Sequence, residues 1–257
     1  MFRPQASDLG LQTSNLRHWT FRLKTFDFGT SHFIPLDSNC SMGRAGVRWW
    51  RSVGPDAGVA PMERILDLGC GTGDSWQKLG LKVENRRIVG IDAQWDRVQA
   101  ANLKYSGRGW EYLCALGEEI LLPDGSVQGV FCNVASPYMH IPRTLAELRR
   151  VLVPGGWLKA SLHAPSFTWR EFRRSFPKPK PSLFRFFVFL NGMVLHCSGS
   201  VMSLGKVAES CQTDAGMRIA LRRAGFTAVS FRREGHRFFV EARREGTSEQ
   251  LVLAPVA

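Results

Sequence analysis

The residues best suited to chemistry lie in one short turn, "LDLGCGTGD", at positions 66–74. Gly69, Gly71 and Gly73 follow an apolar run that is predicted to be a strand, and Asp67 and Asp74 flank them. Glycine lets the backbone approach a ligand closely, and a helix that begins after such a turn presents free N–H groups. The sequence therefore predicts a ligand site at the end of a strand.

The spacing of this turn separates the common nucleotide-like ligands. A dinucleotide site requires a third glycine in the pattern G-x-G-x-x-G, and Asp74 occupies that position. The lysine of a phosphate-binding P-loop is absent as well. Carboxylates beside the turn repel a pyrophosphate and attract positive charge. We therefore predict a cationic ligand without phosphate.

Alternating strands and helices must position this turn. Apolar residues at helical spacing are expected at Trp95, Val98 and Leu103, and Pro142 suits the first turn of a further amphipathic helix. Such alternation is typical of a parallel, doubly wound α/β sheet. This part of the chain is predicted to contain five strands, at 64–68, 86–92, 109–115, 126–135 and 157–163, and helices within 74–85, 94–106 and 142–152.

The C-terminal part continues the same scheme. A helix is predicted over 213–226, with Thr213 as its N-cap and Gly225 as its left-handed stop. Strands at 227–231 and 236–243 follow, and their tight connection requires antiparallel pairing. The predicted fold is a Rossmann-like, doubly wound, seven-stranded α/β sheet, mostly parallel with one antiparallel strand.

The remaining segments define the predicted domains. We expect an N-terminal extension at 1–60, one domain at 61–244 and a C-terminal tail at 245–257. Within the domain, 166–205 is an insertion whose first half is basic and whose second half is apolar on nearly every side. It is too short to span a bilayer. It either caps the core or forms a lid over a hydrophobic substrate.

The turn "LDLGCGTG" resembles the D-x-G-x-G-x-G signature of class I S-adenosylmethionine-dependent methyltransferases, and most of all their small-molecule "type 11" subgroup. Four further blocks resemble the same family in the same order: "VGID", "LPDGSVQGVFCN", "LAELRRVLVPGGWL" and "QTDAGMRIALRRAGF". The resemblance covers 62–164 well and 211–243 more loosely. It does not cover 1–60 or 166–205. It implies S-adenosyl-L-methionine as the cofactor.

The resemblance also implies roles for the glycine turn. The backbone at Gly69, Cys70 and Gly71 would approach the methionine and ribose parts of the cofactor. Gly73 completes the turn, and Asp67 would help to hold the ammonium group.

Two further positions follow from the resemblance at the ends of neighbouring strands. Asp92 would receive the ribose hydroxyls, with capping of the next helix as the alternative, and Ala93 and Gln94 would border the adenine. Asn133, which ends the fourth strand, would face the reacting methyl group.

The chain departs from the family at the loop that contacts the adenine amino group. An acidic residue usually opens this loop, whereas "CALGEEILLPDGS" places Leu116 there. Either Gly117 and Glu118 replace that acid with backbone and side chain, or the adenine is held less specifically.

Tyr138 and His140, in "SPYMHIP", are the candidate catalytic residues. The hydroxyl of Tyr138 could orient a nucleophile, or its ring could cover the cofactor. His140 could act as a general base or lie on the pocket rim, and His163 points toward the same rim. Methyl transfer from a sulfonium is an in-line displacement with an activated leaving group. Orientation can therefore supply most of the catalysis, with a base only where the acceptor must lose a proton.

The sequence indicates no metal or nucleophile mechanism. The six cysteines are scattered, with no C-x-x-C and no histidine pair at ligand spacing. No G-x-S-x-G pattern occurs either. We therefore predict no metal site.

The net charge of +12 is concentrated in one part of the chain. Between Arg143 and Arg244 there are nineteen Lys or Arg residues against six Asp or Glu. This asymmetry suggests an anionic partner, phospholipid or nucleic acid, and plain solubility is the alternative. Base methyltransferases that act on amino groups carry a D/N-P-P-Y/F/W tetrad, whereas this chain has "NVAS" at 133–136. Nucleic acid is therefore the less favoured substrate.

The sequence as a whole predicts S-adenosylmethionine-dependent methyl transfer to a small, hydrophobic acceptor. The alternatives are a nucleic-acid or protein methyltransferase recruited by the basic half, and a binding protein without catalysis. No apolar window of membrane-spanning length and no secretory signal are found. We expect a cytoplasmic protein, and peripheral contact with an anionic membrane is the alternative. The acceptor atom and the oligomeric state are not predicted.

Overall fold

The computed structural model describes residues 63–78, 84, 86–105, 108, 110–205, 207–234 and 237–246, without the side chain of residue 237. The predicted N-terminal extension and nearly all of the predicted tail lie outside the described residues. The domain boundaries predicted above therefore remain predictions.

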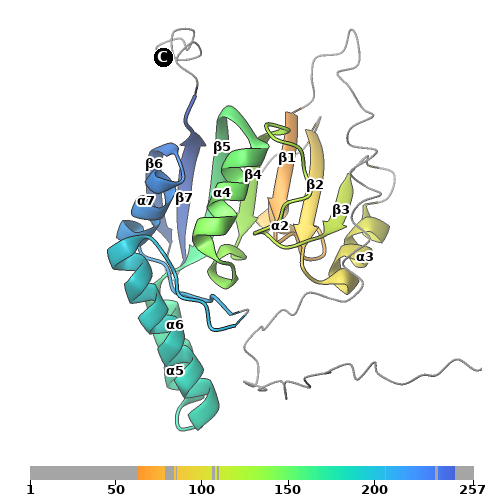
Figure 1. The fold of residues 1–257 in the computed structure, drawn as a ribbon. Helices are drawn as coiled ribbons and strands as arrows, with labels where there is room; N and C mark the ends of the chain where they lie inside the picture. The colour runs from red at the N-terminus through yellow and green to blue at the C-terminus, as the bar shows by residue number, and fades with distance from the viewer. Residues whose placement is uncertain are drawn as a thin grey trace, which may run out of the picture.

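Seven strands form one sheet in the order β3-β2-β1-β4-β5-β7-β6 (Figure 1). Strand β7 pairs antiparallel with both β5 and β6, and the pairs among β1 to β5 are parallel. The predicted fold class is confirmed. The strands are β1 (Glu63–Leu68), β2 (Arg86–Asp92), β3 (Glu111–Cys114), β4 (Val127–Asn133), β5 (Leu152–His163), β6 (Phe226–Glu234) and β7 (Arg237–Arg244).

Helices cover both faces of the sheet because alternate residues of each strand point to opposite sides. On one face, Leu113 of β3 belongs to the large core that includes Leu145 and Leu148 of α4 (Ile141–Val151), and also residues of α7 (Asp214–Arg223). On the other face, Tyr112 packs with Val98 of α3 (Trp95–Lys104).

The strand order places a topological switch between β1 and β4. The chain leaves β1 for β2 and β3 on one side, and returns to β4 on the other side. The connections that follow β1 and β4 therefore run in opposite directions. Open α/β sheets bind ligands in the crevice between two such connections, at the carboxyl ends of the strands. The glycine turn after β1 and Asn133 at the end of β4 both lie at this edge.

Several local predictions are confirmed by capping contacts. The side chain of Thr213 accepts a hydrogen bond from the backbone N–H of Gly216 at 3.1 Å, as an N-cap does. Gly225 has a φ of 78° just after α7, the left-handed conformation expected of a helix stop. The predicted helix after the glycine turn is present as the short α2 (Ser75–Lys78).

Two details differ from the predictions. Leu103 was expected on the apolar face of its helix, but its exposed fraction is 80%, and Ala101 is buried instead. Strand β5 begins at Leu152, five residues earlier than expected, because the "PGG" segment continues the strand instead of separating it from α4.

The insertion folds as a helical hairpin that continues from the end of β5. Helices α5 (Pro165–Ser175) and α6 (Pro179–Ser198) pack against each other. Figure 1 shows the hairpin extending beyond the carboxyl edge of the sheet, with the end of α6 beside α7. A Cβ on Gly216 would lie 2.5 Å from the carbonyl oxygen of Leu195, so the absence of a side chain there allows α7 to approach α6 closely.

Candidate cofactor and acceptor site

The glycine turn wraps over the end of β2. The backbone N–H groups of Gly69 and Cys70 donate to the carbonyl oxygen of Ile91 at 2.7 and 3.1 Å. Gly69, Gly71 and Gly73 all have positive φ, at 69°, 54° and 86°. The turn therefore uses a conformation that other residues rarely adopt.

The three glycines differ in what surrounds them. A Cβ on Gly69 would lie 2.1 Å from the Cβ of Ala135, and one on Gly73 would lie 2.6 Å from the ring of Tyr105. Among the described residues, a Cβ on Gly71 would meet no atom within 4 Å. Gly69 and Gly73 are thus required by packing, whereas Gly71 faces open space where a ligand can approach the backbone.

Asp92 connects this turn to the loop after β2. One carboxylate oxygen accepts from the N–H of Gly71 and the other from the N–H of Gln94, each at 2.9 Å. Its exposed fraction is 7%. A carboxylate has about four lone-pair sites, so Asp92 keeps acceptor capacity for hydroxyl groups of a ligand. The bond to Gln94 supports the residue directly before α3, but Asp92 is not itself the N-cap of that helix, which is Gln94.

The two acids that flank the turn have different surroundings. Asp67 is fully buried in β1. Asp74 forms an ion pair with Lys104 at 2.6 Å and accepts from the hydroxyl of Tyr105 at 2.5 Å. The hydrogen bonds from Lys104 and Tyr105 lower the pKa of Asp74. Its charge therefore joins the turn to α3, and the expectation that Asp74 attracts a cationic ligand stays a prediction.

The loop after β3 lies beside Asp92, as the predicted adenine site requires. The N–H of Ala115 donates to the carbonyl oxygen of Asp92 at 3.1 Å. Leu116 is half-buried, and a Cβ on Gly117 would lie 2.7 Å from the sulfur of Met139. Ala93 directly follows Asp92 and is also half-buried.

Glu118, one candidate to replace the missing acid, has a contact of its own in the structure. Its carboxylate accepts a hydrogen bond from the backbone N–H of His140 at 2.6 Å. This contact joins the loop to the start of α4, which leaves the backbone around Leu116 and Gly117 to border an adenine.

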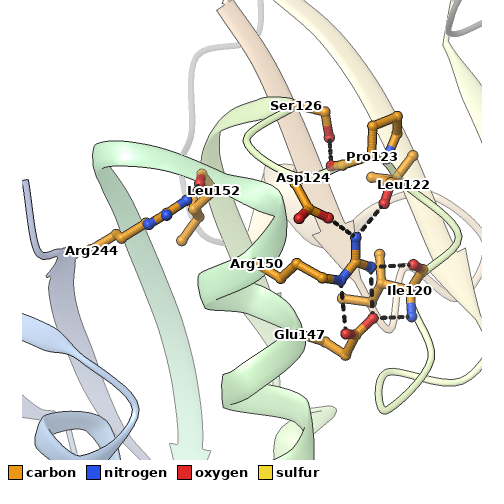
Figure 2. A network of polar contacts seen from close by, with 9 residues as sticks. All are labelled: Ile120, Leu122, Pro123, Asp124, Ser126, Glu147, Arg150, Leu152 and Arg244. Carbon is orange, nitrogen blue, oxygen red and sulfur yellow. Dashed lines mark hydrogen bonds and ion pairs between the residues drawn. The ribbon is translucent and has the colours of Figure 1, made fainter.

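A network around Arg150 holds the other end of this loop (Figure 2). The guanidinium donates to the carbonyl oxygens of Ile120 and Leu122, each at 2.7 Å, and to the carboxylate of Asp124 at 2.8 Å. Glu147 binds the guanidinium at 2.7 Å and accepts from the N–H of Ile120 at 2.9 Å. Figure 2 shows these groups converging from the loop onto the last turns of α4.

Asn133 is fixed at the end of β4 by the neighbouring strand. Its side-chain oxygen accepts from the hydroxyl of Ser161 at 2.7 Å. The next residue, Val134, has a φ of 60° and donates its N–H to the carbonyl oxygen of Ser161 at 3.0 Å. A β-branched residue in this region is strained, and such strain persists only where the surrounding structure enforces it.

An aromatic wall, which we define as Tyr138, His163 and Phe167, stands beyond Asn133. Tyr138 and His163 meet edge to face, with ring centroids 6.4 Å apart, and His163 stacks on Phe167 of α5 at 3.9 Å. Burial and the nearby Glu209 carboxylate raise the pKa of Tyr138 to about 12. The predicted proximity of Tyr138 and His163 is thus observed.

The ring of His140 has a structural contact. Its Nδ1 accepts from the N–H of Arg143 at 3.4 Å, so His140 is the N-cap of α4. Glu118 also accepts the backbone N–H of His140, so both contacts of His140 hold the start of α4.

One buried ion pair beside the aromatic wall was not predicted. Arg185 of α6 donates to the carboxylate of Glu209 at 3.0 Å, and their side chains are only 15% and 10% exposed. Burial raises the pKa of Glu209 to about 7, against the opposing effect of Arg185. The N–H of Ser210 donates to the carbonyl oxygen of Pro137 at 3.0 Å, which brings this segment beside Tyr138. No motif marks this pair, because its members are 24 residues apart.

No metal cluster marks the site within the described residues. Among them, no group of three or more His, Cys, Asp or Glu side chains could hold a metal ion. A cavity of about 340 Å³ lies elsewhere, lined by Arg86, Trp157 and Arg243 among others, and it contains none of the predicted site residues. We therefore place the candidate site at the glycine turn and not at this cavity.

Comparisons with known proteins find similarity to methyltransferases. Residues 65–156 match the family model of a methyltransferase domain. The chain is 26% identical over 145 residues to a fatty-acid O-methyltransferase of Mycolicibacterium smegmatis, covering 55% of this chain and 52% of that protein. It is 30% identical over 141 residues to a demethylmenaquinone methyltransferase of Symbiobacterium thermophilum, covering 51% and 54%. The chain thus spans about half the length of both relatives.

A solved structure shares the fold. The S-adenosylmethionine-dependent methyltransferase of Methanosarcina mazei aligns with a TM-score of 0.50 and 16% identity, over 74% of this chain and 95% of that one. The strand order and the glycine turn with Asp92 agree with the match of residues 65–156 to a methyltransferase domain.

Proposed function

We propose that the chain transfers the methyl group of S-adenosyl-L-methionine to a small, lipophilic acceptor at the carboxyl edge of β4 and β5. The observation that carries this proposal is the arrangement at Gly71, whose backbone faces open space and whose N–H is held by Asp92. A bound ligand can occupy that space without moving any side chain of the turn.

The residues present fit the cofactor. Asp92 would bind the ribose hydroxyls, and Asp67 would lie below the turn near the ammonium group. Asn133 would border the methyl group, while Leu116 and Gly117 would border the adenine. When bound, the cofactor supplies a methyl group on a positively charged sulfur. The neutral thioether that remains after the transfer is a good leaving group.

The aromatic wall supports a lipophilic acceptor. Its rings offer apolar area beyond Asn133, and α5 contributes Phe167 to it. The relatives named for a fatty acid and for demethylmenaquinone have acceptors of this chemical class. The wall would orient the acceptor in line with the methyl group, the main requirement of a displacement reaction.

Tyr138 and His140 are proposed to have different roles. The raised pKa of Tyr138 keeps its phenol neutral near pH 7, so it orients an acceptor atom by hydrogen bonding and does not remove a proton. His140 is proposed to hold the start of α4 through its capping contact. Where an acceptor must lose a proton, Glu209 is the better placed group, with a pKa of about 7 beside Tyr138.

Calorimetry with S-adenosylhomocysteine tests the cofactor part of the proposal. Asp92→Ala should weaken binding by roughly tenfold or more, equivalent to about 1.4 kcal/mol. Asp96→Ala, at an exposed position of α3, is the matched control and should leave binding unchanged. Absence of binding to the unaltered chain would refute the proposal.

A second assay tests methyl transfer itself. The chain is incubated with S-adenosylmethionine that carries a labelled methyl group, together with a lipid extract or with nucleic acid. Label in the lipid fraction supports the proposed acceptor class. Label in the nucleic acid would support the alternative of recruitment by the basic half. Cofactor binding without label in any acceptor would support a binding protein without catalysis.

A further inference from the structure

Exposed apolar side chains concentrate on the hairpin and the loop after it. Of eleven large hydrophobic residues that are exposed among the described residues, nine lie between positions 169 and 204. Exposed apolar patches of this kind mark interaction surfaces. The nine are Trp169, Phe176, Leu183, Phe186, Phe189, Leu190, Met193, Met202 and Leu204.

Helix α6 is apolar on two opposite sides. Its buried side contains Phe184, Val188 and Leu195. A second row, at Leu183, Phe186, Leu190 and Met193, follows helical spacing but is exposed, and Phe189 borders it. We call these five exposed residues the α6 stripe. A surface helix of a globular protein normally has a polar side facing water, so the stripe indicates a second partner.

Polar contacts fix α6 in this orientation. The side chain of Asn191 is fully buried and donates to the carbonyl oxygens of Met202, Ala208 and Glu209 at 3.1, 3.2 and 3.0 Å. The Arg185–Glu209 ion pair adds a second anchor on the same segment. The apolar side that stays exposed is therefore set by buried contacts on the other side of the helix.

The charges on the hairpin are strongly one-sided. Residues 165–198 contain six Lys or Arg residues and a single acid, Glu171, which is paired with Arg170 and Arg174. Arg173, Arg174, Lys178 and Lys180 are exposed around the turn that joins the two helices. Cations beside exposed aromatic and aliphatic side chains match the headgroup and acyl layers of an anionic bilayer.

We propose that the α5–α6 hairpin docks on the surface of an anionic lipid bilayer. The α6 stripe enters the boundary between headgroups and acyl chains, and Arg173, Lys178 and Lys180 bind lipid phosphates. The docking is peripheral, since no helix among the described residues is long and apolar enough to cross a membrane.

Two other occupants of this surface fit less well. Nucleic acid would neutralise the cations but would leave the aliphatic side chains of the α6 stripe without apolar contact. A second copy of the chain would cover the stripe but would offer the cations around the turn no anionic partner of matching density, because the whole chain is basic with a net charge of +12. An anionic bilayer satisfies both the charge and the apolar surface.

The docking goes beyond methyl transfer and does not depend on it. If the proposed function also holds, the hairpin links the bilayer to the acceptor site, because Phe167 of α5 belongs to the aromatic wall. A lipophilic acceptor could then reach the site without crossing water.

Vesicle flotation with the full chain tests the proposal. Vesicles of phosphatidylcholine alone are compared with vesicles that also contain the anionic lipid phosphatidylglycerol. We expect binding to the anionic vesicles that weakens roughly tenfold or more when salt rises from about 0.1 M to about 0.5 M.

Two variants separate the apolar and charged contributions. The double variant Phe186→Gln/Met193→Gln and the double variant Arg173→Glu/Lys178→Glu should each reduce binding roughly tenfold or more. Leu103→Gln removes an exposed leucine of α3, outside the hairpin, and should change nothing. Since all five positions are exposed, melting temperature and S-adenosylhomocysteine binding should stay near those of the unaltered chain, which excludes misfolding as the cause.

Three results would overturn the proposal. The first is no binding of the unaltered chain to anionic vesicles. The second is retention on duplex DNA with no retention on vesicles. The third is a dimer in solution that the Phe186→Gln/Met193→Gln variant dissociates, with no vesicle binding by either form. None of these results bears on cofactor binding, so a failure of the docking proposal is distinguishable from a failure of the proposed function.

Discussion

The carboxylate of Asp92 accepts the backbone N–H of Gly71 at 2.9 Å, across 21 positions of the chain. This contact makes the end of β2 a support for the turn after β1. Gly71 follows β1 and Asp92 ends the neighbouring β2, so the same bond that stabilises the turn also holds a carboxylate at the carboxyl edge of the sheet.

The glycine turn gives the first prediction, because its glycines are required for different reasons. Gly71→Ala should lose cofactor affinity roughly tenfold or more, while its positive φ should cost only about 1 kcal/mol in the free energy of unfolding. Gly69→Ala should cost clearly more, since its Cβ would lie 2.1 Å from that of Ala135. Urea denaturation and calorimetry with S-adenosylhomocysteine on both variants measure the two effects. Equal destabilisation by the two would contradict this assignment.

The Arg150 network gives a prediction about the adenine-side loop. Arg150→Met removes charge-assisted hydrogen bonds to two carbonyl oxygens and two carboxylates, and should lower the free energy of unfolding by about 2–3 kcal/mol. Hydrogen exchange of residues 120–124 should accelerate most. Arg143→Met, at an exposed position of the same helix, should change the free energy of unfolding by about 0.5 kcal/mol at most.

Glu209 predicts a pH dependence of stability. Burial raises its folded pKa from 4.5 to about 7, so between these values the folded state binds more protons than the unfolded state. The stability that protonated Glu209 contributes is therefore full below about pH 4.5 and is lost as the pH rises through about 7. The loss in the free energy of unfolding is up to about 3 kcal/mol. The lowered pKa values of Asp74 and Glu147 act in the opposite direction and at lower pH.

The variant Glu209→Gln isolates this effect. It should remove the part of the pH dependence that lies between about pH 4.5 and 7, because glutamine resembles the protonated acid and does not titrate. Urea denaturation of both proteins at a series of pH values gives the difference directly. If the two profiles ran parallel through this range, the ionisation of Glu209 would not be coupled to folding.

The proposed role of the Tyr138 hydroxyl predicts that removing it changes kcat and KM to different extents. Tyr138→Phe keeps the ring of the aromatic wall and removes the hydroxyl, so kcat should fall roughly tenfold while KM changes little. The pH profile of the reaction should keep its shape, because the pKa of about 12 leaves the phenol neutral throughout the usual range. Initial rates across that range test this, and a lost ionisation in the variant would instead identify Tyr138 as the base.

The parts of the structure that sequence could predict are those encoded by local pattern. The strand at Arg86–Asp92 and the cap at Thr213 depend on residues close together in the chain, and both are confirmed. The antiparallel last strand followed from the length of one connection. Asp92 was placed by its distance from the glycine turn in the family motif.

The missed features depend on residues far apart in the chain. Asp74 meets Lys104 across 30 positions, and Arg185 meets Glu209 across 24, so no local pattern reveals either pair. Leu103 fitted a helical apolar face, but Ala101 takes the buried place. In each case the tertiary packing decides which of several locally plausible positions is used.

The loop after β3 has a consequence for how the two substrates would bind. Glu118 joins it to the start of α4, and Glu147 with Arg150 joins it to the end of the same helix. The start of α4 also follows directly on the segment that carries Tyr138. If an adenine orders this loop, we expect it to order the acceptor side as well. Because thermodynamic coupling is reciprocal, a bound acceptor should then raise the affinity for the cofactor by the same factor.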